Sequence, residues 1–240
     1  MQFKNLTLDK FQKDAIDAVE KNNSVVVSAP TGSGKTLIAD YIIDKHLGDG
    51  SIIIYTAPIK ALSNQKYKDF CKDYGKDSVG LITGDIVINP GAPVLVMTTE
   101  IYRNMTIIND PMLSSVKYVI FDEIHYINDI ERGYVWEESI IFSKKHVRFL
   151  CLSATIPNVK EFSAWISAIK KHKVEVVKYT NRPVPLEKKF FDAELGITTL
   201  EELKKRTEMS LSRKRLWGTP NRREMAPIPK HTELIKEIKE

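Results

Sequence analysis

Short apolar runs alternate with helical patterns from residue 24 to residue 179, and no other feature of the sequence constrains the fold as strongly. Runs rich in β-branched residues predict strands at 24–28, 51–56, 79–82, 93–97, 117–121, 147–152 and 174–179. Apolar residues at helical spacing predict helices at 35–47, 60–74, 100–107, 131–142 and 159–170. Strands that are apolar throughout and alternate with helices form a parallel sheet with both faces covered. The sequence therefore predicts an α/β doubly wound domain that ends near Tyr179.

The pattern changes after Asn181, where the sequence N-R-P-V-P-L interrupts regular structure with two prolines. The remaining segments predict an extended arm at 184–191, a helix with a basic face at 198–216, a loop at 218–229 and a further helix that starts at 231. We therefore expect one domain over 1–181 and a basic helical and loop extension over 182–240. Because the last helical pattern is cut short, we also expect the chain to be part of a longer protein.

The first predicted strand is followed by A-P-T-G-S-G-K-T, directly before the first predicted helix. This sequence fits the phosphate-binding P-loop pattern G-x-x-x-x-G-K-[ST], except that Ala29 replaces the first glycine. Glycines let the backbone turn its N–H groups toward phosphate oxygens, and the helix adds the positive end of its dipole. Lys35 is placed to bind the β- and γ-phosphates, and the hydroxyl of Thr36 to coordinate Mg²⁺. The expected triphosphate-binding residues are Pro30, Thr31, Gly32, Ser33, Gly34, Lys35 and Thr36.

A second signal lies in V-I-F-D-E-I-H, where a predicted strand ends in two carboxylates. Ligands of doubly wound sheets bind outside the carboxyl ends of the strands, so Asp122 and Glu123 should lie at the same edge as the P-loop. Asp122 is suited to hold Mg²⁺, and Glu123 to assist the metal and to position and deprotonate an attacking water. His125 is expected to link this site to the next element. Ser153 and Thr155, in S-A-T at the end of another predicted strand, carry hydroxyls that can bond to the acidic pair.

The net charge of +5 is concentrated in one segment. Between residues 204 and 223 the chain carries eight lysines and arginines and one glutamate. Such a segment can bind nucleic-acid phosphates, with Trp217 offering a face for base stacking, or it can be a solvated helix face. Charge patterning alone favours neither interpretation.

The three motifs A-P-T-G-S-G-K-T, D-E-I-H and S-A-T together resemble those of the first motor domain of superfamily 2 helicases. Further segments narrow the resemblance to superkiller-type DExH RNA helicases, relatives of those that feed the RNA exosome. These segments are T-A-P-I-K-A-L-S-N-Q-K-Y, G-L-I-T-G-D-I-V-I-N-P, V-M-T-T-E-I-Y-R-N-M, F-D-E-I-H-Y-I-N-D-I-E-R-G-Y-V-W-E-E and L-S-A-T-I-P-N. The resemblance covers residues 6–186 and implies a RecA-like fold. It also implies an enzyme that hydrolyses ATP, with Mg²⁺, to translocate on nucleic acid and unwind it.

By position, the resemblance implies roles for individual residues. Gln12 matches a residue that hydrogen-bonds the adenine base, and Leu6 stands where relatives can carry an aromatic ring that stacks on adenine. Further residues match motifs that track the nucleic-acid backbone: Pro58, Lys60, Thr83, Gly84, Thr98, Thr99, Glu100 and Arg103. Hydroxyls at strand ends and helix N-termini suit such phosphate contacts, which carry no sequence information.

The expected partners are single-stranded or partly duplex RNA, with DNA as an alternative, and proteins of RNA degradation. The two cysteines, Cys71 and Cys151, lie far apart and in no metal-binding spacing, which is typical of an intracellular chain. No apolar run is long enough to span a bilayer. We therefore expect a cytoplasmic monomer with no membrane partner.

Alternatives stay open. Backbone tracking does not distinguish RNA from DNA, so the chain could belong to a DNA helicase of the same superfamily. A P-loop kinase would need an acceptor pocket and a lid, of which the sequence shows no trace. A nucleic-acid-binding module with decayed ATPase motifs is disfavoured by the intact Lys35, Thr36, Asp122 and Glu123. Nothing after Asn181 resembles the second motor domain, which in this family supplies arginine fingers, so we expect the chain to bind ATP·Mg²⁺ but to hydrolyse it poorly alone.

Overall fold

The computed structural model of the chain describes residues 1–154, 156, 158–182, 189–192 and 196–206. The chain divides into two units, Met1–Pro183 and Val184–Glu240. The predicted boundary after residue 181 stays a prediction.

The described part of the second unit is a short antiparallel strand pair followed by a helical stretch. The strands are β11 (Phe190–Asp192) and β12 (Gly196–Thr198), and residues 200–206 are helical. Thr198, expected at the start of a helix, is instead the last residue of a strand. The predicted loop at 218–229, the final helix and most of the basic segment lie outside the described residues.

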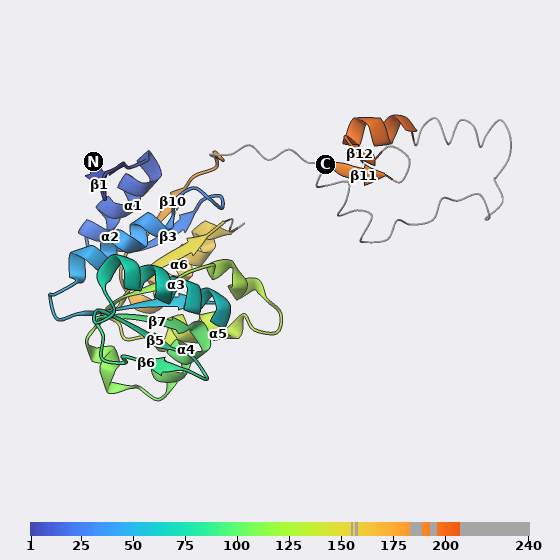
Figure 1. Cartoon of the computed structure of the whole chain (residues 1–240). Coiled ribbons are helices and arrows are strands. Elements are labelled where there is room, and N and C mark those ends of the chain that lie inside the picture. Colours follow the sequence, from blue (N-terminus) through green and yellow to red (C-terminus); the bar gives the residue numbers. More distant parts are fainter. Residues whose placement is uncertain (155, 157, 183–188, 193–195, 207–240) are drawn as a thin grey trace. The chain divides into compact units, whose positions relative to one another are not determined.

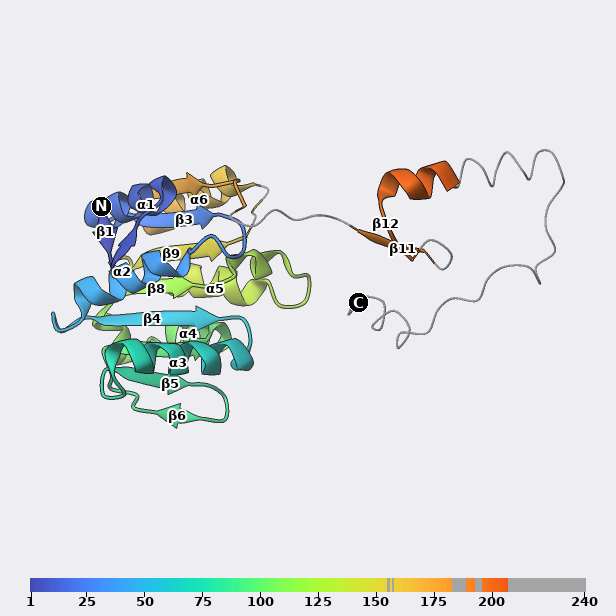
Figure 2. The same ribbon diagram turned by 45° about the horizontal axis from the view of Figure 1, so that its top comes forward.

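The first unit is built on an eight-stranded sheet with the order β10-β3-β9-β8-β4-β7-β5-β6 (Figures 1 and 2). Neighbouring strands from β10 to β5 are parallel, and the edge strand β6 runs antiparallel to β5. In chain order the strands are β3 (Ser24–Ser28), β4 (Ile52–Ala57), β5 (Val79–Ile82), β6 (Val87–Ile88), β7 (Val94–Thr98), β8 (Val116–Phe121), β9 (Arg148–Ser153) and β10 (Val174–Lys178). The prediction of a doubly wound, mostly parallel sheet is confirmed. A separate hairpin, β1 (Gln2–Phe3) and β2 (Leu6–Thr7), precedes the sheet.

Helices cover both faces of this sheet (Figure 2). They are α1 (Lys10–Glu20), α2 (Thr36–His46), α3 (Lys60–Tyr74), α4 (Thr99–Ile107), α5 (Tyr134–Phe142) and α6 (Val159–Lys170), with the short 3₁₀ helices η1 (Pro111–Ser114) and η2 (Ile124–Asn128). Buried residues of α1, α2 and α3 form one apolar cluster with the sheet, and those of α4, α5 and α6 form another. Because strand side chains alternate between faces, Val25 and Val27 enter the first cluster and Val26 the second. This two-sided burial explains why the strands are apolar at every position.

No helix in the described part of the chain combines the length and the apolar character needed to cross a membrane.

Helix α1 is not among the predicted elements, although its sequence carries the signals of a helix. The backbone N–H of Asp9 donates to Oε1 of Gln12 at 2.8 Å as part of a capping box. Phe11, Ala15 and Ile16 are buried along one side of the helix. Helix α1 therefore packs on the sheet and brings Gln12 toward the P-loop.

Helix α5 begins three residues later than predicted, at Tyr134. The Oδ1 atom of Asp129 accepts hydrogen bonds from the backbone N–H groups of Glu131 and Arg132, both at 2.9 Å, and these bonds hold a turn before the helix. Gly133 is needed in this turn, because a Cβ there would lie 2.3 Å from the carbonyl oxygen of Ile127. The turn leaves Arg132 outside the helix.

Two adjacent residues of α5 test its packing. Ile140 is fully buried, whereas Ile141 is 43% exposed. We expect Ile140→Ala to lower the free energy of unfolding by about 2–5 kcal/mol, because it removes buried methylene groups and leaves a cavity. Ile141→Ala should change it by less than about 0.5 kcal/mol. Urea denaturation followed by circular dichroism measures both values, and equal losses in the two variants would contradict this orientation of α5.

Candidate functional site

The P-loop turns sharply between β3 and α2. Gly32 and Gly34 have φ angles of +79° and +80°, which glycine adopts without strain and other residues rarely adopt. A Cβ on Gly34 would also lie 2.8 Å from Nε2 of Gln12. The loop leads into α2 at Thr36, and the first-turn N–H groups of a helix have no partner within it. The hydroxyl of Ser33 is buried and has no hydrogen-bond partner among the described residues. The loop thus gathers donors in the manner of an anion site.

The side chain of Lys35 folds back over the same loop. Its Nζ donates hydrogen bonds to the carbonyl oxygens of Ala29 at 2.7 Å and Pro30 at 3.0 Å. Burial lowers the pKa of Lys35, and the negative charges of Glu123 and Asp122 act in the opposite direction. The ammonium therefore lies within electrostatic reach of the acidic pair.

Gln12 connects α1 to the P-loop. Its side chain is buried, and its Nε2 donates to the carbonyl oxygen of Gly34 at 3.1 Å while its Oε1 accepts from Asp9. Both ends of the amide are thus engaged within the chain. The role of Gln12 toward adenine stays a prediction, as does that of Thr31, which is exposed in the loop.

Asp122 lies directly after β8 and is held on several sides. Its Oδ2 accepts a hydrogen bond from the hydroxyl of Tyr55 at 2.6 Å, and its Oδ1 accepts from the backbone N–H of Glu123 at 3.0 Å. Its own N–H donates to the carbonyl oxygen of Thr56 at 3.0 Å. Burial, and then the charge of Asp122, raise the pKa of Tyr55 well above its usual value, so the phenol stays protonated and donates to the carboxylate. Tyr55, on β4, was not among the predicted site residues because its partner is 67 positions away.

Glu123 stands in an unusual backbone conformation. Its φ is 51° and its ψ 45°, in the left-handed region that is uncommon for residues other than glycine. Its Oε2 lies 3.2 Å from Nδ1 of His125, on η2. That nitrogen is buried, and the geometry of a hydrogen bond is not met with any described residue. Backbone strain of this kind clusters at functional sites, which makes the turn at Glu123 a candidate catalytic element.

Strand β9 lies between β3 and β8 and brings Ser153 to the same edge. Ser153 pairs with Ser28 in the strand register, and its carbonyl oxygen accepts from the N–H of Ala29 at 3.0 Å. The end of β9 is therefore hydrogen-bonded to the start of the P-loop. Thr155 lies outside the described residues.

A second candidate site lies at the carboxyl ends of β4 and β7, at the starts of α3 and α4. A cavity of about 540 Å³ is present there. Its lining includes five residues that were predicted to track nucleic acid: Pro58, Lys60, Gly84, Thr98 and Glu100. The structure thus brings together residues from segments far apart in the sequence.

The other residues predicted for nucleic acid do not line this cavity. Thr83 and Thr99 are buried, and their hydroxyls form hydrogen bonds within the chain. The hydroxyl of Thr83 accepts from the N–H of Ile86 at 3.2 Å, and that of Thr99 donates to the carbonyl oxygen of Ala57 at 3.5 Å. The Nε atom of Arg103 donates to Glu138 at 2.5 Å. Their roles toward nucleic acid stay predictions.

Arg132 lines the same cavity and was not among the predicted site residues. Its Nη2 donates to the carbonyl oxygen of Pro58 at 2.9 Å and forms an ion pair with Glu100. Its guanidinium also lies 5.8 Å from the centre of the Trp136 ring. One arginine therefore connects the turn after η2 to the starts of α3 and α4. The only signal in the sequence is a basic residue in D-I-E-R-G-Y, which does not indicate these distant partners.

Solved structures share this fold. The Mycobacterium smegmatis helicase Lhr bound to ssDNA and AMP-PNP matches with a TM-score of 0.57 and 27% identity, over 76% of this chain and 26% of that chain. The DUF1998 helicase MrfA bound to DNA matches with a TM-score of 0.57 and 21% identity, over 72% of this chain and 27% of that chain. At that identity the second likeness shows the fold alone.

Curated relatives are closer in sequence. DExH-box ATP-dependent RNA helicase DExH11 of Arabidopsis thaliana is 51% identical over 180 residues, which are 75% of this chain and 13% of the relative. Antiviral helicase SKI2 of Saccharomyces cerevisiae is 49% identical over 180 residues, 75% of this chain and 14% of the relative. Exosome RNA helicase MTR4 of Mus musculus is 48% identical over 186 residues, 78% of this chain and 18% of the relative. The chain spans less than a fifth of the length of these relatives.

The family comparison covers most of the first unit. Residues 9–162 match the model described as DEAD/DEAH box helicase, and this range contains the P-loop, the acidic pair and the second cavity. Since the match extends over more than half of the sequence, the chain belongs to the DEAD/DEAH box helicase family.

Proposed function

We propose that this chain is the ATP-binding motor domain of an ATP-dependent RNA helicase, in which ATP hydrolysis drives movement along RNA and its unwinding. The observation that carries the proposal is the edge of the sheet at which Lys35, Asp122 and Glu123 lie together. The same edge holds the cavity lined by Lys60 and Arg132. A triphosphate site and a candidate nucleic-acid site on one rigid sheet are what such a motor requires.

Each residue of the triphosphate site has a proposed task. Lys35 leaves the carbonyl oxygens of its own loop and binds the β- and γ-phosphates, and P-loop N–H groups bind further phosphate oxygens. Thr36 and Asp122, with Glu123, would hold Mg²⁺, which neutralises charge on the phosphates when bound. Two acceptor positions of the Asp122 carboxylate are taken by Tyr55 and Glu123, and such a group offers about four, so others stay available to a metal or its waters. Glu123 orients the attacking water and accepts its proton.

RNA is favoured over DNA as the nucleic acid. Relatives at 48–51% identity include DExH-box ATP-dependent RNA helicase DExH11 and Exosome RNA helicase MTR4, whereas the helicase bound to ssDNA is 27% identical. The name Exosome RNA helicase MTR4 also supports partners from RNA degradation. A DNA helicase is the second candidate. The proposal also includes action in the cytoplasm, which the two widely separated cysteines support, and a monomeric state.

The triphosphate site is tested with a fluorescent ATP analogue and Mg²⁺. We expect Lys35→Ala to weaken binding at least about tenfold, because hydrogen bonds to charged groups contribute ~1.5–3 kcal/mol. Lys45→Ala is the matched control, since Lys45 lies in the last turn of α2, at the opposite end of the helix from Lys35, and pairs with Glu20 at 2.8 Å. Equal affinities of the two variants would contradict the assigned role of Lys35.

Glu123→Gln separates binding from hydrolysis. The variant should bind the analogue with an affinity within about twofold of the unchanged chain, whereas the slow turnover of the chain falls at least about a hundredfold, as for loss of a general base. Phosphate release measures turnover. RNA-stimulated turnover by the unchanged chain at the rate of a complete two-domain helicase would contradict the need for a second domain.

Nucleic-acid binding is tested with single-stranded RNA and with DNA of the same sequence, by fluorescence anisotropy at several salt concentrations. We expect the RNA to bind more tightly, and Lys60→Ala to reduce the salt slope by about 1, the loss of one phosphate contact. Lys60 is paired with Asp85, so Asp85→Asn should strengthen binding. Lys68→Ala, on the exposed side of α3, is the control. An unchanged slope in Lys60→Ala, or tighter binding of DNA, would contradict the proposal.

Arg132 is proposed as a positioning residue for the same interface. Arg132→Ala should weaken RNA binding about fivefold or more, because the starts of α3 and α4 lose their shared donor, while affinity for the ATP analogue stays within about twofold. Arg132→Lys should not restore binding, since the single ammonium of lysine cannot reproduce the planar, forked hydrogen-bond donors of the guanidinium. Arg148→Ala removes an arginine that bonds carbonyl oxygens of Asn22 and His146 elsewhere in the fold and serves as control. RNA affinity equal to that of the control would contradict this role.

A further inference from the structure

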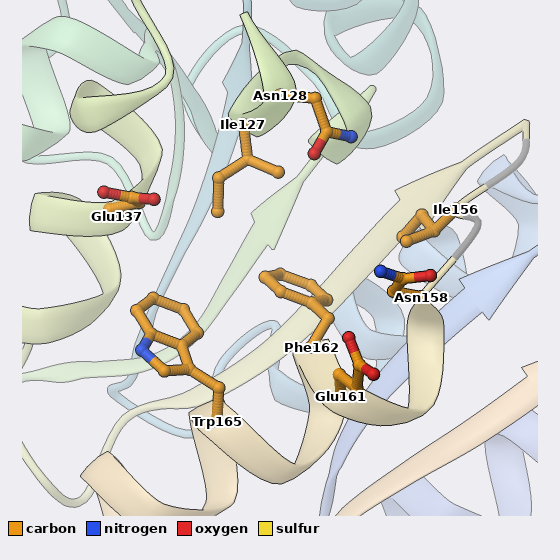
Figure 3. A pocket seen from close by; sticks show the side chains of 8 residues that line it. All are labelled: Ile127, Asn128, Glu137, Ile156, Asn158, Glu161, Phe162 and Trp165. Atoms are coloured by element: carbon orange, nitrogen blue, oxygen red, sulfur yellow. The ribbon is translucent and has the colours of Figure 1, made fainter.

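A separate hollow of about 590 Å³ opens between η2, α5 and α6 (Figure 3). Its lining includes the apolar side chains of Ile127, Ile156, Phe162 and Trp165. None of these residues has a part in the triphosphate site or in the cavity at Lys60. The hollow is within the size range of pockets that bind ligands in proteins, about 300–1,000 Å³.

The apolar part of the hollow is aromatic and accessible. The rings of Phe162 and Trp165 stack with centroids 5.9 Å apart and planes at 21°, and both side chains are half-buried. Figure 3 shows both rings projecting from α6 toward Ile127. Partly covered aromatic rings of this kind are typical anchor points of protein interfaces, where they contribute large apolar area at small entropic cost.

The border of the hollow is acidic. Glu137 projects from α5 and Glu161 from α6, and both are exposed (Figure 3). None of the lining residues is a lysine or an arginine. Within the described part of the chain, neither carboxylate forms an ion pair, in contrast to Glu100 and Glu138. The hollow therefore combines an apolar floor with uncompensated negative charge.

This combination of charge and shape selects the occupant. Stacked rings alone could receive a nucleic-acid base, but carboxylates on both sides would repel its phosphates. A positively charged peptide meets the opposite condition, because its lysines or arginines approach the carboxylates while an apolar side chain enters between them. We propose that the hollow docks a peptide segment of a partner protein that carries one aromatic or long aliphatic anchor flanked by lysine or arginine.

The proposal is tested by selection from a phage library of random dodecapeptides on the whole chain, with Trp165→Ala as the counter-target. Sequences with one large apolar residue and neighbouring basic residues should be enriched on the unchanged chain. The best peptide, made synthetically with a fluorescent label, should bind at least about tenfold more weakly to Trp165→Ala, as expected for loss of an anchor contact. Ile108→Ala removes an apolar residue that is 71% exposed and lies outside the hollow, and should leave affinity unchanged.

Charge is tested independently, in a way that does not depend on the folding of the Trp165 variant. The double variant Glu137→Lys with Glu161→Lys should bind the basic peptide at least about tenfold more weakly and prefer a peptide with glutamates in place of its basic residues. The double variant Asp17→Lys with Asp77→Lys makes the same charge change at two exposed positions outside the hollow and should bind the basic peptide with an affinity much closer to that of the unchanged chain. Binding of the ATP analogue confirms that each variant is folded.

Three results would overturn the proposal. The first is no enrichment over Trp165→Ala, and the second is enrichment of acidic or uncharged sequences. The third is displacement of the selected peptide by single-stranded RNA, with binding of that RNA lost in Trp165→Ala. This result would assign the hollow to nucleic acid.

Discussion

The parallel hydrogen bonding of β3, β9, β8, β4 and β7 is the constraint on which both candidate sites depend. Because the strands are parallel, their carboxyl ends meet at one edge, and the register brings Ser28 beside Ser153 and Ala57 beside Thr98. The P-loop, the acidic pair and the starts of α3 and α4 all follow directly from these ends. A shift in register would separate Lys35 from Asp122 without altering either loop.

Charged groups at this edge are satisfied within the chain before any ligand binds. Lys35 bonds to carbonyl oxygens of its own loop, and three further cations form ion pairs, namely Lys60 with Asp85, Arg103 with Glu138 and Arg132 with Glu100. A phosphate that binds one of these four cations must therefore replace an existing partner, so its net contribution is a difference between two interactions. Asp122 differs, because its bond from Tyr55 leaves acceptor positions open and can persist when a ligand arrives. We infer that ligand binding here exchanges ion pairs around a fixed carboxylate.

The sequence predicts those parts of the molecule that local pattern determines. The central strands are apolar at every position because both faces are covered, and the P-loop is marked by its glycines and lysine. Helix α1 carries a capping box and an apolar face, which are signals of a helix. It is not among the predicted elements, because its start is interpreted only as a contact of Gln12 with adenine. Strand β6 is two exposed residues and gives no periodic signal. Tyr55 and Arg132 could not be assigned because their roles come from partners that only the folded sheet brings near.

The segment that follows β8, residues 123–133, reaches all three of the sites that are proposed to bind a ligand. At its start, Glu123 lies within electrostatic reach of Lys35 of the proposed triphosphate site, whereas Arg132 lines the cavity at Lys60 and Ile127 lines the acidic hollow. Glu123 is held in a left-handed conformation, and Gly133 is closely packed on the carbonyl oxygen of Ile127, so the segment has little freedom to adjust at one point alone. A movement of this segment on nucleotide binding would therefore displace Arg132 and Ile127 together. Short, tightly packed connections of this kind can couple neighbouring sites through direct contacts alone.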